Sequence, residues 1–575
     1  MQKILLGTIS NVHQDWLPYA SGCLISYANK DPFIKENYTF LEPEWRSNCL
    51  DNKDFHTKIE QTDILGLTCY VWNQVINDQI AKLFKSVNPK GIVIFGGPNV
   101  PEDEEEIQDY INTRQWVDYF FIGPGEEIFL NFLKSNKNEK FVYGKQIKPE
   151  DLSSPYAENI FKSILRKSGN ISAAIETNRG CPYSCSFCDW GGQASNKIIR
   201  FDKDLIKNNI TTAMEEKNII RLEILDANFG VFEQDLKYVQ HIISEKDRLN
   251  KHSMLLTFAG LAKNGSKYLI EIMKLVLDNF NDKYRNVKIS FQTLTDDVLV
   301  NIDRKNIKSE KLYSITSQLT DVTINSEIII GLPGETSTSF LDTLCKHIEL
   351  NIDFARTYPL YILPNTPMNK KEYRQKFNIN SKKIYLPYDL SKYRQSKLYN
   401  DRHNLVNIKT ACDFKTKIDF ESFEMIYSCV SYNPAELVQM YDYWFWYNTF
   451  YNAGVAKEYI KEHTLAPQEQ AFWFFNNLDN MPFFNNLVNE NRSCAKATVA
   501  CTEPETFVYT LRDLNWLHKA QGRGIELVEI YNNQNTVTEE LKQLYSNYNT
   551  SHFNNISEKD LPKLMSSFSS IDGVL

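Results

Sequence analysis

Three cysteines stand close together in one short segment of this 575-residue chain: Cys181, Cys185 and Cys188. The segment, residues 176–192, reads ETNRGCPYSCSFCDWGG, so that three and then two residues separate the cysteines. Three thiolates can hold three irons of a 4Fe–4S cluster and leave the fourth iron open. A catalytic cluster needs an open iron for a ligand, whereas electron-transfer clusters usually have four protein thiolates.

A structural zinc ion is the alternative occupant of this segment. Zinc would require a fourth Cys or His nearby, and none lies within the loop. The spacing by itself leaves both interpretations open.

The composition indicates a soluble globular protein of several domains. Hydrophobic residues make up 42% of the chain and charged residues 24%. The formal net charge of −8 disfavours nucleic acid as a partner. The N-terminus lacks a basic region before its short apolar run, and no apolar stretch approaches the ~20 residues of a membrane span. We therefore expect a cytoplasmic protein whose 11 cysteines are mostly reduced thiols.

Residues 1–135 are predicted to alternate between strands and helices, and such elements could position a site of this kind. Short apolar runs at Lys3–Ser10, Asp63–Cys69, Gly91–Gly96 and Val117–Ile122 predict strands, and helical stretches such as Gln74–Val87 fall between them. This pattern predicts an α/β domain, a Rossmann-like doubly wound parallel sheet with helices on both faces. Ligands of such sheets bind at the carboxyl ends of the strands.

Three further regions follow. Residues 136–160 are polar and contain proline, which predicts a linker. Residues 161–390 contain six strand candidates separated by helical segments, which predicts a partial (β/α)6 barrel with its chemistry at the strand carboxyl ends. Residues 391–575 are predicted to form a mostly helical domain. The strand candidates read ISAAIET, IIRLEILDA, SMLLTFA, NVKISFQT, VTINSEIIIG and TYPLYILP.

The cysteine loop resembles that of the radical S-adenosylmethionine (SAM) superfamily, in which Cys-x3-Cys-x-aromatic-Cys follows the first barrel strand. Phe187 occupies the aromatic position. Over about residues 60–370 the chain resembles the subgroup that carries a cobalamin domain. The downstream landmarks match in order: LDANFG at Leu225–Gly230, SFQTL at Ser290–Leu294, EIIIGLPGET at Glu327–Thr336 and LPNTPM at Leu363–Met368.

This resemblance implies that the open iron binds SAM and that the reduced cluster cleaves it to a 5′-deoxyadenosyl radical. It also implies roles for residues at the ends of later strands, although a simple barrel-rim hydrogen bond is the alternative for each. The implied SAM contacts are Phe187 in the cysteine loop, Asp226 and Asn228 at the amino group, Ser290 and Gln292 at the ribose or carboxylate, and Gly331, Leu332 and Pro333 at the adenine.

Three loops of the first domain look like the cobalamin-binding loops of this subgroup: GLTCYVWN (Gly66–Asn73), IFGGPNVPE (Ile94–Glu102) and VDYFFIGPGEE (Val117–Glu127). Their glycines would let the backbone approach a bulky ligand. A nucleotide-type pocket, or a domain that holds nothing, is the alternative. The implied cobalamin contacts are Thr68, Tyr70, Trp72, Gly96, Gly97, Pro98, Gly123, Gly125 and Glu126.

His13 is the candidate for a lower ligand of cobalamin. Relatives with an imidazole ligand use Asp-x-His-x-x-Gly, but here Asn11 replaces the aspartate and Trp16 the glycine. A ligating histidine normally has an acidic or carbonyl partner, so a solvent or core histidine is the alternative.

The reaction that the resemblance implies is methylation of an unactivated carbon of a small-molecule or peptide substrate, with electrons from a protein such as flavodoxin or ferredoxin. A cobalamin-dependent cyclisation or rearrangement without methyl transfer is the alternative. A methylthiotransferase would need a second cluster, for which Cys23, Cys49 and Cys69 are available, but their sequence neighbours do not resemble that family. A non-enzymatic sensor is disfavoured because the SAM landmarks accompany the cysteines.

An aromatic stretch, YDYWFWYNTFY at Tyr441–Tyr451, has two interpretations. It could line a substrate pocket or stack on the corrin, but a helix packed against the barrel mouth is the interpretation we favour.

Overall fold

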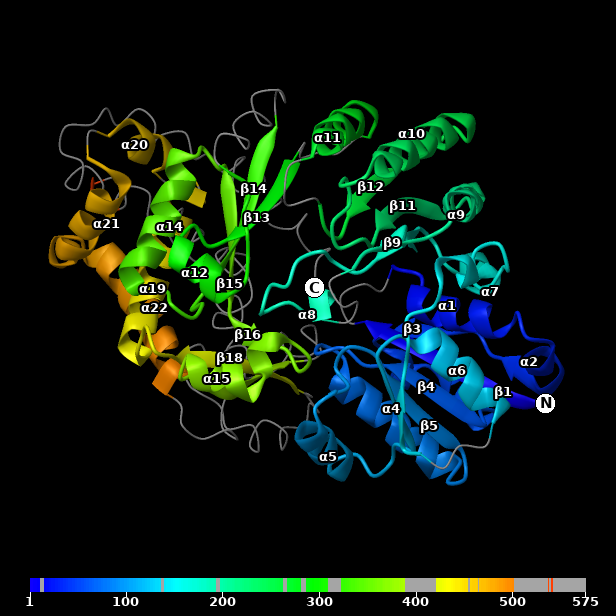
Figure 1. Cartoon of the computed structure of the whole chain (residues 1–575). Coiled ribbons are helices and arrows are strands. Elements are labelled where there is room, and N and C mark those ends of the chain that lie inside the picture. Colours follow the sequence, from blue (N-terminus) through cyan, green and yellow to red (C-terminus); the bar gives the residue numbers. More distant parts are fainter. Residues whose placement is uncertain are drawn as a thin grey trace. The chain divides into compact units, whose positions relative to one another are not determined.

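A computed structural model describes residues 1–10, 15–135, 139–192, 197–261, 266–280, 286–308, 322–387, 420–500 and 536–540, apart from single positions in the last two ranges. The chain divides into two compact units. The first contains residues 1–283 and 363–369, and the second contains residues 284–362 and 370–575. Each unit is described by itself below, and Figure 1 labels their elements.

The first unit opens with a sheet in which every strand pairs in parallel. Its order is β2–β1–β4–β5–β6–β7, and β3 also pairs with β1. The central strands are apolar and buried, as expected for a sheet covered on both faces. The strands are β1 (Gln2–Ser10), β2 (Tyr38–Phe40), β3 (Glu44–Arg46), β4 (Ile64–Thr68), β5 (Ile92–Gly96), β6 (Tyr119–Ile122) and β7 (Phe141–Tyr143).

Helices connect these strands, and the four predicted strands and the helix Gln74–Val87 are confirmed. The order of the sheet reverses between β1 and β4, which makes the carboxyl ends of these two strands the topological switch point. The predicted doubly wound sheet is therefore present. The helices are α1 (Tyr19–Ala28), α2 (Pro32–Asn37), α3 (Lys53–Glu60), α4 (Gln74–Val87), α5 (Glu104–Asn112) and α6 (Gly125–Lys134).

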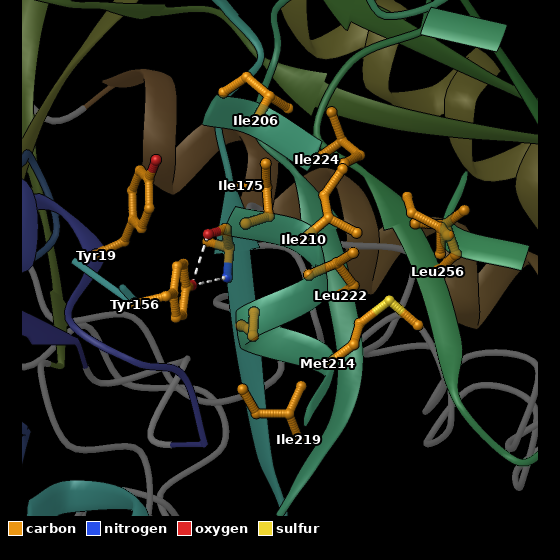
Figure 2. Packing of buried hydrophobic residues seen from close by; sticks show 14 of the residues in the cluster. Tyr19, Tyr156, Ile175, Ile206, Ile210, Met214, Ile219, Leu222, Ile224 and Leu256 are labelled. Atoms are coloured by element: carbon orange, nitrogen blue, oxygen red, sulfur yellow. Dashed lines mark hydrogen bonds between the residues drawn. The ribbon is translucent and has the colours of Figure 1, made fainter. Parts of the chain in front are cut away.

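Residues 136–160, predicted to be a linker, are partly built into the fold. They contain β7, which pairs with β6, and the 3-10 turn Pro149–Asp151. Tyr156 is buried, and its hydroxyl exchanges hydrogen bonds with the backbone of Ala174 (Figure 2). The segment was predicted to be a linker because it is mostly polar. A few buried apolar side chains are nevertheless enough to attach it to the core.

A second parallel sheet of the first unit has the order β12–β11–β8. Isoleucine and leucine side chains of its strands pack with Ile206, Ile210 and Met214 of α9 in one core (Figure 2). The elements are α7 (Lys162–Lys167), β8 (Ile171–Ile175), α9 (Lys203–Glu215), β11 (Ile219–Ile224), α10 (Glu233–Arg248), β12 (Leu255–Phe258) and α11 (Lys267–Asn279).

The second unit contains another parallel sheet, of order β13–β14–β15. All six strand candidates between residues 171 and 359 are thus confirmed as strands, three in each unit. The elements are β13 (Asn286–Gln292), α12 (Asp296–Asn301), β14 (Thr323–Ile330), α14 (Ser337–Glu349) and β15 (Phe354–Pro359).

An antiparallel sheet of order β16–β18–β17 follows, which the sequence did not predict. The chain beyond β18 is helical over the described residues, as expected. The elements are β16 (Tyr361–Ile362), α15 (Lys371–Lys376), β17 (Asn380–Pro387), β18 (Phe420–Ser428), α19 (Pro434–Trp446), the π-helical turn η4 (Tyr447–Asn452), α20 (Lys457–Glu462), α21 (Pro467–Asn476) and α22 (Pro482–Ala500).

The aromatic stretch forms the end of α19 and the η4 turn. Trp444, Trp446 and Tyr447 are fully buried, and α19 packs against α14 and α22. The Tyr451 hydroxyl donates to the carbonyl of Ile352, just before β15 begins. The packing interpretation is therefore correct, but the contact lies at the amino end of β15 and not at the carboxyl end, where a barrel mouth would be.

Among the described residues, no helix is both long enough and apolar enough to cross a membrane.

Candidate functional site

The cysteine loop lies between two short elements that follow β8. The strand β9 (Asn178–Arg179) pairs with β10 (Ile199–Arg200), and α8 (Asp189–Gly192) follows the third cysteine. Gly180 has a φ of 98°, a left-handed conformation that favours glycine, and it turns the chain into the loop. Cys181 and Cys185 are buried, Cys188 and Phe187 are half-buried, and none of the three thiols is in a disulfide.

Asp226, just after β11, holds the entrance of this loop. Its carboxylate accepts hydrogen bonds from the backbone N–H of Thr177 at 2.7 Å and from the Thr177 hydroxyl. It also accepts from the backbone and the side-chain amide of Asn178. Burial raises the pKa of Asp226 to about 8 although these hydrogen bonds act to lower it. The structure thus uses this residue, predicted to lie near the SAM amino group, to position the cysteine loop.

Asn228 is the residue that reaches the cysteines. Its side-chain Nδ2 lies 2.8 Å from the sulfur of Cys181. Its Oδ1 is buried and has no hydrogen-bond partner among the described residues. A buried acceptor of this kind requires a donor, and an ammonium group would satisfy it. This geometry fits the predicted place of Asn228 beside the SAM amino group.

The three donor thiols suit a cluster better than a single ion. Among the described residues, no three His, Cys, Asp or Glu side chains converge closely enough to hold one metal ion. A four-iron cluster makes a different demand, because each thiolate binds its own iron. The amide of Asn228 would then donate to a ligating sulfur, a contact that tunes the potential of such clusters.

The loop after β4 lies at the switch point of the first sheet. The rings of Tyr70 and Trp72 are stacked, with centroids 4.6 Å apart and an angle of 8° between their planes. Fully buried Asn73 fixes this loop: its amide donates to the carbonyls of Ile9 and Thr68, and its Oδ1 accepts from the Tyr70 N–H. The predicted contacts Thr68, Tyr70 and Trp72 are therefore held at the edge where a ligand of this fold would bind.

Gly97, just after β5, has a packing role in addition to its predicted contact with cobalamin. Gly97 has a φ of 106°, and a Cβ placed there would lie 2.9 Å from the carbonyl oxygen of Cys69. The N–H of Cys69 donates to the carbonyl of Gly96 at 2.6 Å. Gly97 is thus required for packing between the β4 and β5 loops, whether or not a ligand is bound.

The loop after β6 contacts the cysteine loop directly. Glu126 is buried and pairs with the Arg179 guanidinium at 2.9 Å. Arg179 also makes a two-point contact with Glu176. Glu126, predicted to touch cobalamin, is therefore engaged by an arginine that lies two residues before Cys181. In the same loop Gly123 has a φ of 79°, and Gly125 begins α6.

Residues 363–369, noted in the sequence only as a landmark, join the two halves of the first unit. The Asn365 amide donates to the carbonyls of Pro98 and Val100, both at 2.9 Å, and its Oδ1 accepts from the N–H of Glu102 at 2.9 Å. The N–H of Met368 donates to the carbonyl of Ser186, between the second and third cysteines. One segment thus binds both the predicted cobalamin loop and the predicted cluster loop. Nothing in its composition signalled this.

The remaining predicted SAM residues belong to the second unit, at the ends of β13 and β14. The Ser290 hydroxyl donates to Glu327, and Gln292 is buried with a φ of 69°. The carbonyl of Gly331 accepts from the Tyr432 hydroxyl at 2.7 Å. Leu332 is fully buried, and the carbonyl of Pro333 accepts from the side chain of Asn301.

The remaining candidates are His13 and the three cysteines of the first domain. His13 and Asn11 are not among the described residues. Cys23 lies in α1, Cys49 in a 3-10 turn and Cys69 after β4, and each is buried. Burial raises the pKa of the Cys49 and Cys69 thiols to about 12, which favours neutral packed thiols at these positions.

The two relatives at 30% identity are both methyltransferases. No protein-family model matches the chain. It is 30% identical over 400 residues to the cobalamin-dependent radical SAM methyltransferase TokK of Streptomyces tokunonensis, an alignment of 64% of this chain and 57% of TokK. It is 30% identical over 384 residues to the 2-(S-pantetheinyl)-carbapenam-3-carboxylate methyltransferase of Streptantibioticus cattleyicolor, covering 62% and 55%.

More distant similarities accompany these two. A tRNA-2-methylthio-N(6)-dimethylallyladenosine synthase of Marinomonas sp. is 21% identical over 54% of this chain and 69% of its own length. Among solved structures, cobalamin-dependent OxsB aligns with a TM-score of 0.49 at 12% identity, covering 100% of this chain and 84% of OxsB. The methyltransferase TsrM of Kitasatospora setae aligns with a TM-score of 0.47 at 15% identity, covering 64% and 77%.

The chain spans little more than half the length of the two relatives it matches at 30% identity. The alignments with these relatives and the ordered motifs of the cysteine loop and strand ends agree with each other. By its sequence, the chain is similar to cobalamin-dependent radical SAM methyltransferases over 62–64% of its length.

Proposed function

We propose that this chain is an enzyme that cleaves SAM reductively and methylates an unactivated carbon of a small molecule, using cobalamin. One observation carries the proposal: the cysteine loop and the predicted cobalamin loops are hydrogen-bonded into one assembly, through Arg179 with Glu126 and through residues 363–369. The two relatives at 30% identity are both methyltransferases, which supports the same reaction class.

The chain's own residues would bind and orient three cofactors. Cys181, Cys185 and Cys188 would hold the 4Fe–4S cluster, and Asn228 would donate to the Cys181 sulfur while its free oxygen accepts from the SAM ammonium. Tyr70 and Trp72 would offer a flat aromatic surface at the cobalamin edge. When bound, the cluster supplies an electron to SAM and cobalamin supplies the transferred methyl group.

We take the proposed substrate class from the two relatives at 30% identity. The printed name of one of them gives a carbapenam that bears a carboxylate and a pantetheinyl thioether. We propose a small molecule as the substrate of this chain, a reducing protein such as flavodoxin or ferredoxin as its electron donor, and the cytoplasm as its location.

Radical rearrangement without methyl transfer is the second candidate reaction. Sulfur insertion is less favoured, because Cys23, Cys49 and Cys69 lie in separate elements and are buried as neutral thiols.

Isotopic labelling tests the proposal. The reconstituted enzyme is incubated anaerobically with a reductant, candidate carbapenam carboxylates and SAM that carries a deuterated methyl group. Methylation predicts a labelled product together with both deoxyadenosine and S-adenosylhomocysteine. Deoxyadenosine with an unlabelled, altered product would move the enzyme to the rearrangement class.

A further inference from the structure

The two faces of the β13–β14–β15 sheet differ sharply in chemistry. One face is apolar and packs against α14: Phe291 contacts the His347 ring, and the Ser326 hydroxyl lies 3.0 Å from the ring Nε2 of His347. Because side chains alternate along a strand, the intervening residues point to the opposite face. That face carries Lys288, Ser290, Glu327, Arg356 and Tyr358.

Glu327, in the middle strand, is already fully engaged. Lys288 Nζ lies 2.5 Å from one carboxylate oxygen, and the Ser290 hydroxyl donates to the other at 2.6 Å. Burial acts to raise the pKa of Glu327, but the Lys288 ammonium and these hydrogen bonds lower it overall. Glu327 is therefore a carboxylate whose charge is balanced by Lys288.

Arg356 on β15 pairs in register with Glu327 and helps to lower its pKa electrostatically, but among the described residues the two side chains form no ion pair. Arg356 is only 8% exposed. Among the described residues, its single side-chain hydrogen bond is to the Tyr358 hydroxyl at 3.0 Å, and no carboxylate lies within ion-pair distance. A guanidinium has five N–H donors, so most donors of Arg356 have no hydrogen-bond partner among the described residues. The side chains of Lys288, Glu327 and Arg356 together thus carry a net positive charge.

We propose that Arg356, with the Tyr358 hydroxyl beside it, forms a subsite for an anionic group of the substrate, a carboxylate or a phosphate. The planar guanidinium matches both groups through paired N–H donors. Because the Tyr358 hydroxyl accepts from Arg356, its own hydrogen is free to donate to the same anion. The inference rests on the proposed function, to which it adds the chemical class of the substrate.

The position along the strand separates this subsite from the predicted adenine contacts, while Ser290, a predicted contact of the SAM ribose or carboxylate, lies level with Arg356 across Glu327. Arg356 lies three residues before Pro359, the last residue of β15. At about 3.3 Å per residue, this places it roughly 10 Å from the carboxyl end of the strand. The predicted adenine contacts Gly331, Leu332 and Pro333 follow the end of the neighbouring strand β14.

The first test measures how inorganic phosphate changes the melting temperature of wild type and of the Arg356→Gln variant. Both proteins are holoenzymes that carry the cluster and cobalamin. Arg374→Gln is the matched control, because Arg374 is an arginine of the same unit that is paired with Glu424 at 2.7 Å. Without phosphate, Arg356→Gln should melt near the wild-type temperature, since the variant removes a largely buried charge that forms no ion pair among the described residues. Saturating phosphate should raise the melting temperature of wild type and Arg374→Gln by about 2 °C or more, and that of Arg356→Gln by less than half as much. Equal shifts in all three proteins would overturn the subsite.

The second test separates the substrate's anion from the carboxylate of SAM. Deoxyadenosine formation without substrate should show the same KM for SAM in wild type and Arg356→Gln. A tenfold higher KM in the variant would assign Arg356 to SAM and overturn the substrate subsite. The proposed function itself would fail if wild type with a full cluster made no deoxyadenosine. The shifts in melting temperature caused by phosphate would then remain, so the two failures can be told apart.

Discussion

Single residues of the cysteine loop decide whether a cluster can form. We expect Cys181→Ala, Cys185→Ala and Cys188→Ala each to abolish cluster binding and SAM cleavage, because three irons require three thiolates. Iron and sulfide content after anaerobic reconstitution, together with deoxyadenosine formation, measures both effects. Cys345→Ala, which changes a buried cysteine of α14, is the control and should keep the full cluster. A normal cluster in any of the three loop variants would refute the assignment.

The Asn228 side chain contacts the Cys181 sulfur through Nδ2, and its buried Oδ1 has no hydrogen-bond partner among the described residues. Asn228→Leu should retain the cluster but raise the KM for SAM about tenfold, since a hydrogen bond to a charged group is worth roughly 1.5–3 kcal/mol. Loss of the Nδ2 donor should also shift the reduction potential of the cluster. Deoxyadenosine kinetics and redox titration measure these two effects. An unchanged KM would remove Asn228 from the SAM site.

Glu335 gives the second unit a pH-dependent stability. This carboxyl group is fully buried, with the Thr293 hydroxyl donating to it at 3.1 Å, and burial raises its pKa to about 8. The folded protein therefore keeps a proton on Glu335 that the unfolded chain loses above its ordinary pKa near 4.5. Its stabilising contribution is complete below that pH, declines as the pH rises and is lost by about pH 8.

Glu335→Gln should remove this slope while keeping an oxygen that accepts from Thr293. Melting curves of the two proteins between pH 5 and about pH 8 should therefore diverge, with the variant relatively more stable at the alkaline end. Parallel curves would show that Glu335 does not titrate in this range.

At the scale of elements, residues 363–369 connect loops that are far apart in the sequence. Asn365→Ala removes three hydrogen bonds to the β5–α5 loop, and leaving buried carbonyls unpaired costs about 1–3 kcal/mol each. We expect faster hydrogen exchange in residues 97–106 and weaker retention of cobalamin. Asn112→Ala, at the exposed end of α5, is the control and should change neither. Unchanged exchange in Asn365→Ala would mean that the segment does not hold the loop.

Helices and strands were predicted well wherever the local pattern was strong. The apolar runs of β1, β4, β5 and β6 and the six strands β8, β11, β12, β13, β14 and β15 all formed, because each combines a buried apolar sequence with a turn at its end. The short strands β2, β3 and β7 were missed, since three residues carry too little pattern. The antiparallel strands β17 and β18 were missed because their pairing joins segments that are distant in the sequence.

At the scale of the whole molecule, the first sheet should bind cobalamin at its switch point. The wild-type protein should retain cobalamin through gel filtration, and Trp72→Ala should retain at least several-fold less, because it removes one ring of the stacked pair. Phe33→Ala, an exposed aromatic on α2, is the matched control and should behave as wild type. Wild-type protein that elutes free of cobalamin would contradict the assignment of the domain. Gly97 is a poor site for such a test, since its replacement disrupts loop packing directly.

The sequence by itself determined the cysteine loop, the α/β alternation and the resemblance to cobalamin-carrying radical SAM enzymes, because these depend on residue type and short-range spacing. Only the tertiary structure decided what each side chain contacts. Asp226 holds the loop entrance, Glu126 pairs with Arg179, and Arg356 hydrogen-bonds Tyr358 beside Glu327, since these outcomes depend on strand register and on contacts between distant segments. Hydrogen bonds and ion pairs require atoms within a few ångströms, and folding alone brings residues 98 and 365 that close.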